Sequence, residues 1–213
     1  MSIGGNHLIH ILRRNMDIKI LMFNNRIYGL TKGQYSPTSE LGKKTKSTPH
    51  GSLDHPFNPL SLALGSGATF AARTLDREIK HLGEIVKRCN EHRGTSFVDI
   101  YQNCNIYNDG AFFDLTDKET KAETQLILEH GQPMVYGVEQ SKGLRLNGSQ
   151  LESVTLGKDF SIDDILVHDE SNKSLAFYLS EITLDPKLPT PIGVLYKEDK
   201  PTYDEMMKDQ MSE

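Results

Sequence analysis

The sequence predicts an α/β fold, in which a mostly parallel sheet is flanked by helices and followed by a small C-terminal α+β lobe. Two observations predict the sheet: short runs rich in Ile, Val and Phe occur in the N-terminal half, and helix-like segments lie between them. This alternation is typical of βαβ units. A third observation predicts the lobe, because the apolar runs after residue 108 are separated by Gly and Asn, as in hairpins. We therefore expect two regions, 1–108 and 109–213.

In the first region, residues 6–15 are expected to form a helix and residues 17–23 a buried strand. An amphipathic helix is predicted over 76–92 and a second strand over 95–101. The long segment 24–59 is dense in Gly, Pro, Ser, Thr and Asn, which in a compact domain is typical of a functional loop. It follows the first strand at its carboxyl end, where open α/β sheets bind ligands.

The second region has a different pattern, with a helix predicted over 118–130 and a plausible hairpin or meander after it. The expected strands are 133–138, 144–147 and 153–156, and the expected short helices are 163–168 and 174–182. Residues 198–213 are acidic and contain several Met, so this end is expected to be frayed or docked on a partner.

Composition excludes several classes of protein. A net charge of -5 and a pI near 5.9 argue against a general nucleic-acid binder, which needs clustered Lys and Arg. The longest apolar runs are too short to cross a bilayer, and no signal-peptide pattern opens the chain, so we expect no membrane segment and a cytoplasmic protein. Cys89 and Cys104 are the only cysteines, too few for a disulfide framework or for a metal cluster unaided.

The segment Asn24–Gln34 is the most informative stretch for chemistry. An Asn side-chain oxygen and a backbone carbonyl are hard ligands that suit Mg²⁺, although on composition alone a polar turn is favoured. Gly4 and Gly5 open the first helix, either as a glycine turn or as a helix N-terminus that binds an anion. His7 and His10 share a helix face, but no Asp, Glu or third His stands at metal spacing, which disfavours zinc.

Cys104 lies in the polar loop 103–105, which suits either a free, partly buried thiol or a thiolate ligand. Cys89 falls within the predicted helix 76–92 and is interpreted as a small apolar residue. Lys43, Lys44 and Lys46 are interpreted as solvated surface.

Several ordered motifs carry a resemblance to a known family. They are Ser2–His7, Arg13–Asn15, Asn24–Gln34, Ser36–Thr38, His55–Pro59, Gly94–Val98 and Gln102–Asn105. Together they resemble the thiamine-diphosphate domain of 2-oxoacid:ferredoxin oxidoreductase β subunits. The resemblance covers the first half of the chain and is looser beyond about Asp114. It implies a thiamine-diphosphate-binding fold, of which residues 1–108 would be the C-terminal part, while residues 109–213 would be the C-terminal region of the β subunit.

The resemblance also implies a set of cofactor residues. Asn25 would give its side chain and Ile27 its carbonyl to Mg²⁺, and Gly4 would approach the diphosphate. His7 would lie near the cofactor pocket, and His10 is more readily structural. The Gly-Asp-Gly motif that supplies an Asp to Mg²⁺ in this family is not in the sequence, and we expect that motif to precede the position of Met1.

Further residues would line the cofactor or hold a cluster. Tyr28, Gly29, Leu30 and Thr31 would line thiamine diphosphate, with Leu30 on the side of the thiazolium where the substrate reacts. Cys104 would be the fourth ligand of a [4Fe–4S] cluster whose other three thiolates lie outside this sequence.

The same resemblance implies the substrates and partners. Lys32 would pair with the distal carboxylate of 2-oxoglutarate, so Leu30 and Lys32 shape the reacting end of the site. Coenzyme A would accept the acyl group, and lysines 43, 44 and 46 are a less favoured site for its phosphates. The expected partners are an α or fused α/γ subunit and ferredoxin. Two alternatives stay open: a non-oxidative thiamine-diphosphate decarboxylase or synthase, and a noncatalytic remnant or assembly module.

Overall fold

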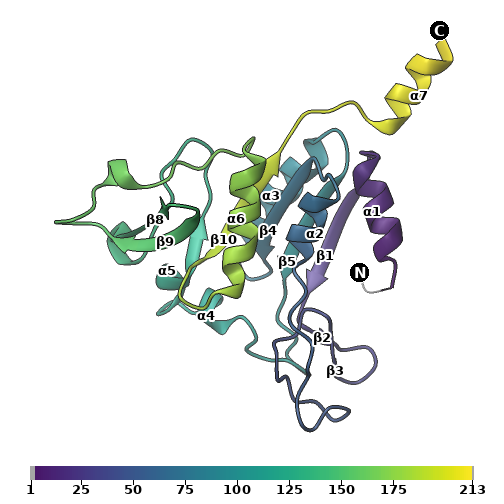
Figure 1. Cartoon of the computed structure of the whole chain (residues 1–213). Helices are drawn as coiled ribbons and strands as arrows, with labels where there is room; N and C mark the ends of the chain where they lie inside the picture. Colours follow the sequence, from purple (N-terminus) through teal and green to yellow (C-terminus); the bar gives the residue numbers. More distant parts are fainter. Residues whose placement is uncertain (1–2, 213) are drawn as a thin grey trace.

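The computed structural model describes residues 3–212, and its centre is a five-stranded sheet of order β1-β5-β4-β10-β6 (Figure 1). The strands are β1 (Lys19–Asn24), β4 (Phe70–Leu75), β5 (Ser96–Tyr101), β6 (Gln125–Ile127) and β10 (Thr190–Lys197). Strands β1, β5 and β4 are parallel to one another, β10 runs antiparallel to β4, and β6 is parallel to β10. The predicted α/β fold with a mostly parallel sheet is confirmed.

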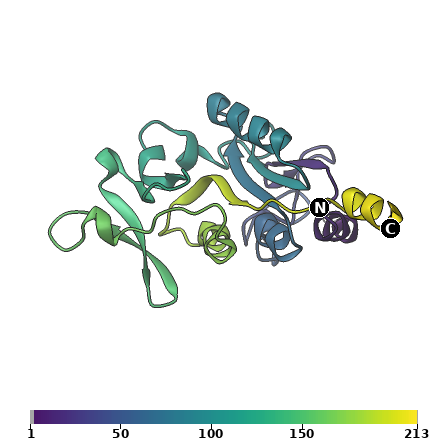
Figure 2. The same cartoon turned by 90° about the horizontal axis from the view of Figure 1, so that it is seen from above.

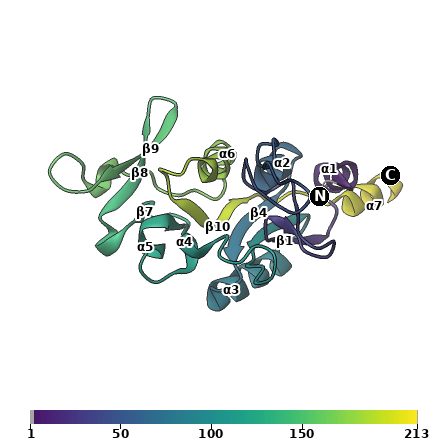
Figure 3. The same ribbon diagram turned by 90° about the horizontal axis from the view of Figure 1, so that it is seen from below.

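Helices cover both faces of this sheet (Figures 2 and 3). One face carries α1 (Gly5–Arg13), α2 (Pro59–Gly65) and α6 (Lys173–Glu181), and the other carries α3 (Ile79–Glu91). Because successive side chains of a strand point to opposite faces, Phe97 packs toward the first group of helices and Val98 toward α3. Cys89 of α3 is 1% exposed and packs in the apolar core, as its sequence interpretation predicts.

The remaining elements surround the sheet. A two-stranded hairpin is formed by β2 (Ile27–Tyr28) and β3 (Gln34–Tyr35), and a three-stranded sheet by β7 (Val135–Tyr136), β8 (Lys142–Asn147) and β9 (Gln150–Thr155). Short helices are α4 (Phe113–Thr116), α5 (Lys121–Thr124) and the 3₁₀ turns Val138–Gln140, Ile162–Asp164 and Ile182–Leu184. The strands of the small lobe thus match the meander that the sequence predicts.

Two predicted helices of the second region are wrong. Over 118–130 the chain forms only the four-residue α5 before turning into β6, because Gln125–Ile127 pair with β10 and complete the sheet. Over 163–168 only the start is helical, as a 3₁₀ turn whose N-terminus is capped by a capping box between Ser161 and Asp164. The backbone of Leu166 then bonds to Leu144, so this stretch is extended.

Two central strands were not predicted at all. Strand β4 contains two Ala and an Arg, and β10 contains Pro191 and Gly193, so neither has a strong strand pattern in sequence. Both are almost wholly buried. The sheet therefore draws strands from both sides of residue 108, and the division into regions 1–108 and 109–213 remains a prediction.

The last helix, α7 (Tyr203–Ser212), lies beyond the sheet next to α1 (Figure 1). It buries none of its residues, and its base is fixed by buried Thr202 and by an ion pair between Arg93 and Glu205. Residues 203–212 are thus an exposed helix, and the last residue of the predicted frayed segment lies outside the described residues. Across 3–212, no helix is long and apolar enough to cross a membrane.

Candidate functional site

The candidate site lies where the carboxyl ends of β1 and β5 meet. Asn24 and Tyr101 are register partners at the ends of these parallel strands, so the loops that follow them begin side by side. One loop carries Asn25 and the other carries Cys104, although the two lie 79 positions apart in the sequence. Figure 1 also shows the start of α1 close to the arrowhead of β1. The fold thereby brings three of the predicted segments to one edge of the sheet.

The predicted cofactor residues form a tight hairpin. Its ends are β2 and β3, and its turn is closed by bonds from Gly33 N to the Tyr28 carbonyl (2.9 Å) and from Lys32 N to the Gly29 carbonyl (3.1 Å). Leu30 is fully exposed at the tip, and Thr31 bonds to Gln34 across the turn. Lys32 has a φ of 73°, an uncommon conformation for a residue with a side chain. The turn therefore presents Leu30 and Lys32 outward together.

Asn25 and Ile27 lie just before this hairpin, within one short turn. The Asn25 Oδ1 accepts a hydrogen bond from Ile27 N at 3.3 Å, which holds the side chain against its own backbone. An amide oxygen and a backbone carbonyl fit the hard-ligand preference of Mg²⁺, but both are uncharged. Within residues 3–212 no group of three or more His, Cys, Asp or Glu could hold a metal. The oxygens of this loop therefore suit a magnesium site only where phosphate or another segment would supply the negative charge.

The hairpin packs directly on the loop that carries Cys104. A Cβ added to Gly29 would lie 3.8 Å from both the Cys104 Sγ and the Tyr107 ring. At Gly33, where φ is +93°, an added Cβ would lie 2.8 Å from the same ring. Glycine is thus required at position 33 both by its backbone conformation and by the close approach of Tyr107. The predicted cofactor residues and the predicted cluster ligand are neighbours in space.

A buried polar network fixes the start of the Asn25 loop. Asn24 donates to Asp99 Oδ1 (3.1 Å) and accepts from the Thr38 hydroxyl (2.7 Å), so one side chain joins the sheet to the loop. Asp99 also pairs with Arg73 at 3.5 Å, and both are almost completely buried. Burial raises the pKa of Asp99, while the neighbouring Arg73 opposes that shift. The carboxylate consequently depends on its partners to stay charged.

Arg26 provides a second anchor for the same loop. Its guanidinium lies 4.6 Å from the Phe112 ring centroid, and Phe112 stacks on Tyr101 at 4.4 Å. Such cation–π contacts are stronger where solvent is excluded, and Phe112 and Tyr101 are both buried. Because Phe112 belongs to the loop after β5, Arg26 ties the two loops together.

The three lysines of the loop differ in their environment. Lys44 and Lys46 are exposed, as the sequence interpretation predicts. Lys43 is partly buried: it forms an ion pair with Glu40 at 2.9 Å and donates to the Asn108 side chain. Lys43 is therefore not solvated surface, because its amine is already bonded inside the site.

Gly4 and His7 belong to α1. Gly4 precedes the helix with a φ of 116° and is exposed, and no side chain caps the first turn. His7 lies with His10 and Tyr203 on a cavity of about 670 Å³ between α1 and α7. It is thus on a different surface of α1 from the apolar face that packs on the sheet.

Two adjoining cavities border the hairpin. One of about 170 Å³ lies behind Asn25 and Ile27, and one of about 500 Å³ is lined by aromatic residues that include Tyr35 and by Asp54. A hydrogen bond from Tyr35 to Asp54 (2.9 Å) raises the pKa of this tyrosine.

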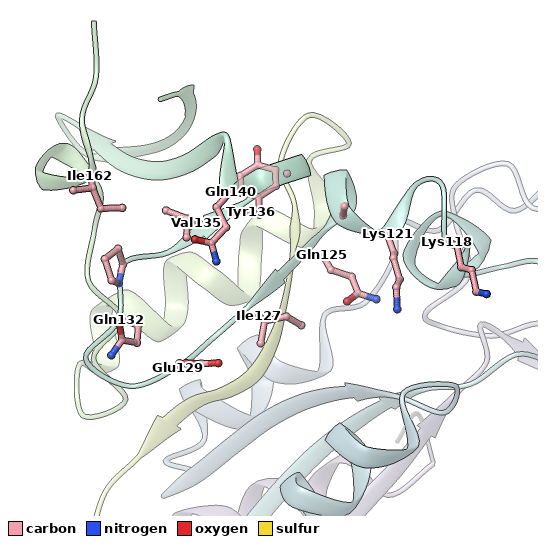
Figure 4. Close-up of a pocket in the computed structure, with 13 residues that line it drawn as sticks. Lys118, Lys121, Gln125, Ile127, Glu129, Gln132, Val135, Tyr136, Gln140 and Ile162 are labelled. Carbon is pink, nitrogen blue, oxygen red and sulfur yellow. The ribbon is translucent and has the colours of Figure 1, made fainter. Parts of the chain in front are cut away.

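A separate open groove of about 470 Å³ lies in the small lobe, beside β6 and β7 (Figure 4). Lys118, Lys121 and Gln125 point to the same side of it. Lys121 is paired with Glu78 at 2.8 Å, and the groove contains none of the predicted site residues.

Sequence reasoning missed the residues that hold the two loops, namely Arg26, Arg73, Asp99 and Asn108. Asn108 is 6% exposed and donates from its Nδ2 to the Asn25 carbonyl at 2.9 Å. A charged residue inside an apolar strand is a signal that could have marked Arg73 and Asp99. Nothing in the sequence around Asn108 distinguishes it from the other Asn residues of its loop.

Comparisons with known proteins agree with this geometry. Residues 1–100 match the family model described as "Thiamine pyrophosphate enzyme, C-terminal TPP binding domain". The chain is 49% identical over 213 residues to the 2-oxoglutarate oxidoreductase subunit KorB of Mycobacterium tuberculosis, covering 99% of this chain and 57% of that protein. It is 46% identical over 109 residues to the 2-oxoacid:ferredoxin oxidoreductase subunit beta of Saccharolobus solfataricus, covering 51% of this chain and 36% of that protein.

A solved structure is similar over the same extent. The 2-oxoglutarate:ferredoxin oxidoreductase from Magnetococcus marinus, with 2-oxoglutarate, coenzyme A and succinyl-CoA bound, superposes with a TM-score of 0.71 at 28% identity. The match covers 99% of this chain and 57% of that chain. The chain thus spans a little over half the length of these two relatives. Its motifs, its sheet and its relatives agree: over almost its whole length the chain is homologous to β subunits of 2-oxoacid:ferredoxin oxidoreductases.

Proposed function

We propose that this chain is part of the β subunit of a thiamine-diphosphate-dependent oxidoreductase that converts a 2-oxoacid to an acyl-CoA and passes the electrons to ferredoxin. The observation that carries the proposal is the contact between the hairpin after Asn25 and the loop of Cys104. An enzyme that moves electrons from an organic cofactor to a cluster needs the two to be close, and this packing would hold them at a fixed separation.

Thiamine diphosphate, when bound, supplies a nucleophilic carbon and an acceptor for the electron pair left by carbon dioxide. The residues of this chain would bind and orient it. Asn25 Oδ1 and the Ile27 carbonyl would hold Mg²⁺, with Gly4 and the first turn of α1 beside the diphosphate. Tyr28, Gly29, Leu30 and Thr31 would line the cofactor, with Leu30 covering the side on which the substrate reacts.

Cys104 would be one thiolate ligand of a [4Fe–4S] cluster, and the other three would come from outside this sequence. A non-oxidative thiamine-diphosphate enzyme would share the Asn25 loop but would have no use for this cysteine. The half-buried thiol next to Gly29 therefore supports the oxidative reaction over that alternative.

The substrate is proposed to be 2-oxoglutarate. Lys32 is exposed beside Leu30 at the tip of the hairpin, where its amine could pair with the distal carboxylate. Relatives named for 2-oxoglutarate, including the M. tuberculosis subunit, support this choice. Coenzyme A would be the acyl acceptor, and Lys44 and Lys46 remain the exposed lysines of the loop available to its phosphates.

The proposed partners are an α or fused α/γ subunit, which would complete the active site, and ferredoxin. We propose a cytoplasmic location for the complex. A noncatalytic assembly module is the second candidate, because the described residues offer Mg²⁺ only uncharged ligands in this loop.

The test uses the chain assembled with the segments that complete its relatives and with the partner subunit. Ferredoxin reduction is measured with 2-oxoglutarate and with pyruvate, each with coenzyme A, and iron is quantified. The proposal expects about four irons per β subunit and fewer in Cys104→Ser, which loses one of the four ligands. It also expects a preference for 2-oxoglutarate that Lys32→Met abolishes. Equal turnover of both acids would refute the substrate, and a complex without iron or activity would favour the assembly module.

A further inference from the structure

Two loops of the candidate site must keep a fixed separation if the proposed function holds. One leaves β1 and carries Asn25, and the other leaves β5 and carries Cys104. Parallel pairing of the two strands ends at Asn24 and Tyr101, so beyond these residues the sheet no longer holds the loops together. Their separation then depends on contacts between the loops.

Asn108 makes two such contacts and one bond within its own loop. Its Nδ2 donates to the Asn25 carbonyl at 2.9 Å, and its Oδ1 accepts from Lys43. Its backbone N–H donates to the Cys104 carbonyl at 2.9 Å, which closes the Cys104 loop as an isolated bridge. The side chain that reaches Asn25 thus belongs to the residue that closes the loop of Cys104.

Both ends of the Asn108 carboxamide are used in this arrangement, and they need opposite hydrogen-bonding character. One end must donate, because the Asn25 carbonyl can only accept, and the other end must accept, because the Lys43 ammonium can only donate. Asparagine is the residue of this length that offers both. Asn108 is only 6% exposed, so loss of its Nδ2 donor would remove a buried partner from the Asn25 carbonyl.

We propose that Asn108 is a positioning residue that holds the Mg²⁺-ligand loop against the Cys104 loop, so that it sets both the orientation of Asn25 and the spacing between cofactor and cluster. The inference rests on the proposed function and deepens it. Arg26, stacked on Phe112, keeps the two loops associated when Asn108 is changed. Substitution of Asn108 therefore loosens the loops without separating them.

Asn108→Asp is the most informative variant. It keeps the backbone bond to Cys104 and an acceptor for Lys43, replaces the donor with an acceptor facing the Asn25 carbonyl, and adds a negative charge that Asn108→Leu does not. Asn108→Leu removes both side-chain bonds at similar volume. Asn103→Ala is the matched control, since the Asn103 side chain bonds to Asp109 and Gly110 within its own loop and, among residues 3–212, makes no hydrogen bond to the Asn25 loop.

The first measurement is hydrogen–deuterium exchange on the 213-residue chain. Both Asn108 variants are expected to speed exchange of amides in 25–35 by about tenfold, the effect of losing roughly one hydrogen bond. The Asn103→Ala control is expected to change exchange only in 102–112. Unchanged exchange in 25–35 for Asn108→Asp would overturn the proposal.

The second measurement uses the complete complex. Asn108→Asp is expected to raise the Mg²⁺ concentration for half-maximal activity by about tenfold, and to shift the reduction potential of the cluster, while Asn103→Ala changes neither. A purely structural role would lower the melting temperature and leave both readouts unchanged, which would overturn the positioning role. If the wild-type complex holds no cluster and needs no Mg²⁺, the proposed function fails, and Asn108 then has no cofactor or cluster to position. The exchange data still report whether the loops are coupled.

Discussion

Replacement of Arg73 by methionine is expected to destabilise the purified chain by about 3–5 kcal/mol, because it leaves the Asp99 carboxylate buried without its paired counter-charge and with only the weaker influence of Arg26. Arg73 is 1% exposed and Asp99 is 0% exposed, with 3.5 Å between the paired nitrogen and oxygen. Methionine keeps most of the apolar length of the side chain, so the cavity contribution is small. The hydrogen bond from Asn24 remains, but a neutral donor compensates a buried charge only in part.

The dependence of this effect on pH follows from Asp99. Burial raises its folded-state pKa above the ordinary value of 3.8, and Arg73 opposes that shift, so removing Arg73 raises the pKa further. A raised folded-state pKa means that the folded protein holds a proton that the unfolded chain has released. The free energy of unfolding contributed by this group is therefore fully present below 3.8 and is lost as pH rises through the folded-state pKa. The loss of unfolding free energy caused by Arg73→Met should therefore grow as pH rises.

Urea unfolding at about pH 5 and about pH 8 tests both points. Arg73→Met, Asp99→Leu and the double variant form a cycle, in which the double variant is expected to recover most of the stability lost by each single change. A deficit below about 1 kcal/mol for Arg73→Met at the higher pH would refute the argument, since that is the cost of an exposed pair. An equal deficit at both pH values would show that Asp99 is not the charge involved.

Three further predictions concern single residues. Gly33→Ala should destabilise the hairpin by about 1–3 kcal/mol, because φ is positive there and the new Cβ would clash with Tyr107. Differential scanning fluorimetry measures the loss of stability, with Gly83→Ala as the control because Gly83 has open space for a Cβ. Burial lowers the pKa of His168 below 6.5, so the free energy of unfolding should fall as pH drops from 6.5 toward the folded-state pKa, and His168→Gln should reduce that slope in urea titrations. Iodoacetamide should alkylate half-buried Cys104 in the folded chain and spare buried Cys89, as peptide mass mapping would show; equal labelling would contradict the fold around α3.

The sequence predicted the parts of the fold that rest on local pattern. Strands β1 and β5 and helix α3 carry clear apolar periodicity, and the structure has all three. Strand β10 was missed because its Pro and Gly weaken the strand pattern, and the burial that stabilises it comes from β4 and β6 on either side. The predicted helix over 118–130 failed for a related reason: its side chains permit a helix, but pairing with β10 decides its backbone.

The candidate site, too, could be predicted from the sequence only in part. The resemblance gave Asn25 and Cys104 separate roles, and the parallel register of β1 and β5 is what brings their loops together. Asn108 and Arg26 could not be predicted, because their roles depend on the positions of residues about eighty places away in the chain. Lys43 was misjudged for the opposite reason, since a Lys in a polar loop is usually solvated, and here Glu40 and Asn108 bind it.

The register of β1 is what the site depends on most, and the buried network specifies it. A slip of two residues would keep every side chain on its proper face but would displace Asn25 from the Cys104 loop by about 7 Å. The same slip would remove Asn24 from Asp99, leaving a buried carboxylate without its donor. The buried Arg73–Asp99 pair therefore disfavours a misaligned β1, because the slip would remove one of the hydrogen bonds to Asp99. We expect the Arg73→Met, Asp99→Leu double variant to be stable yet less uniquely aligned, with faster amide exchange in 19–24; wild-type protection there would show that apolar packing alone sets the register.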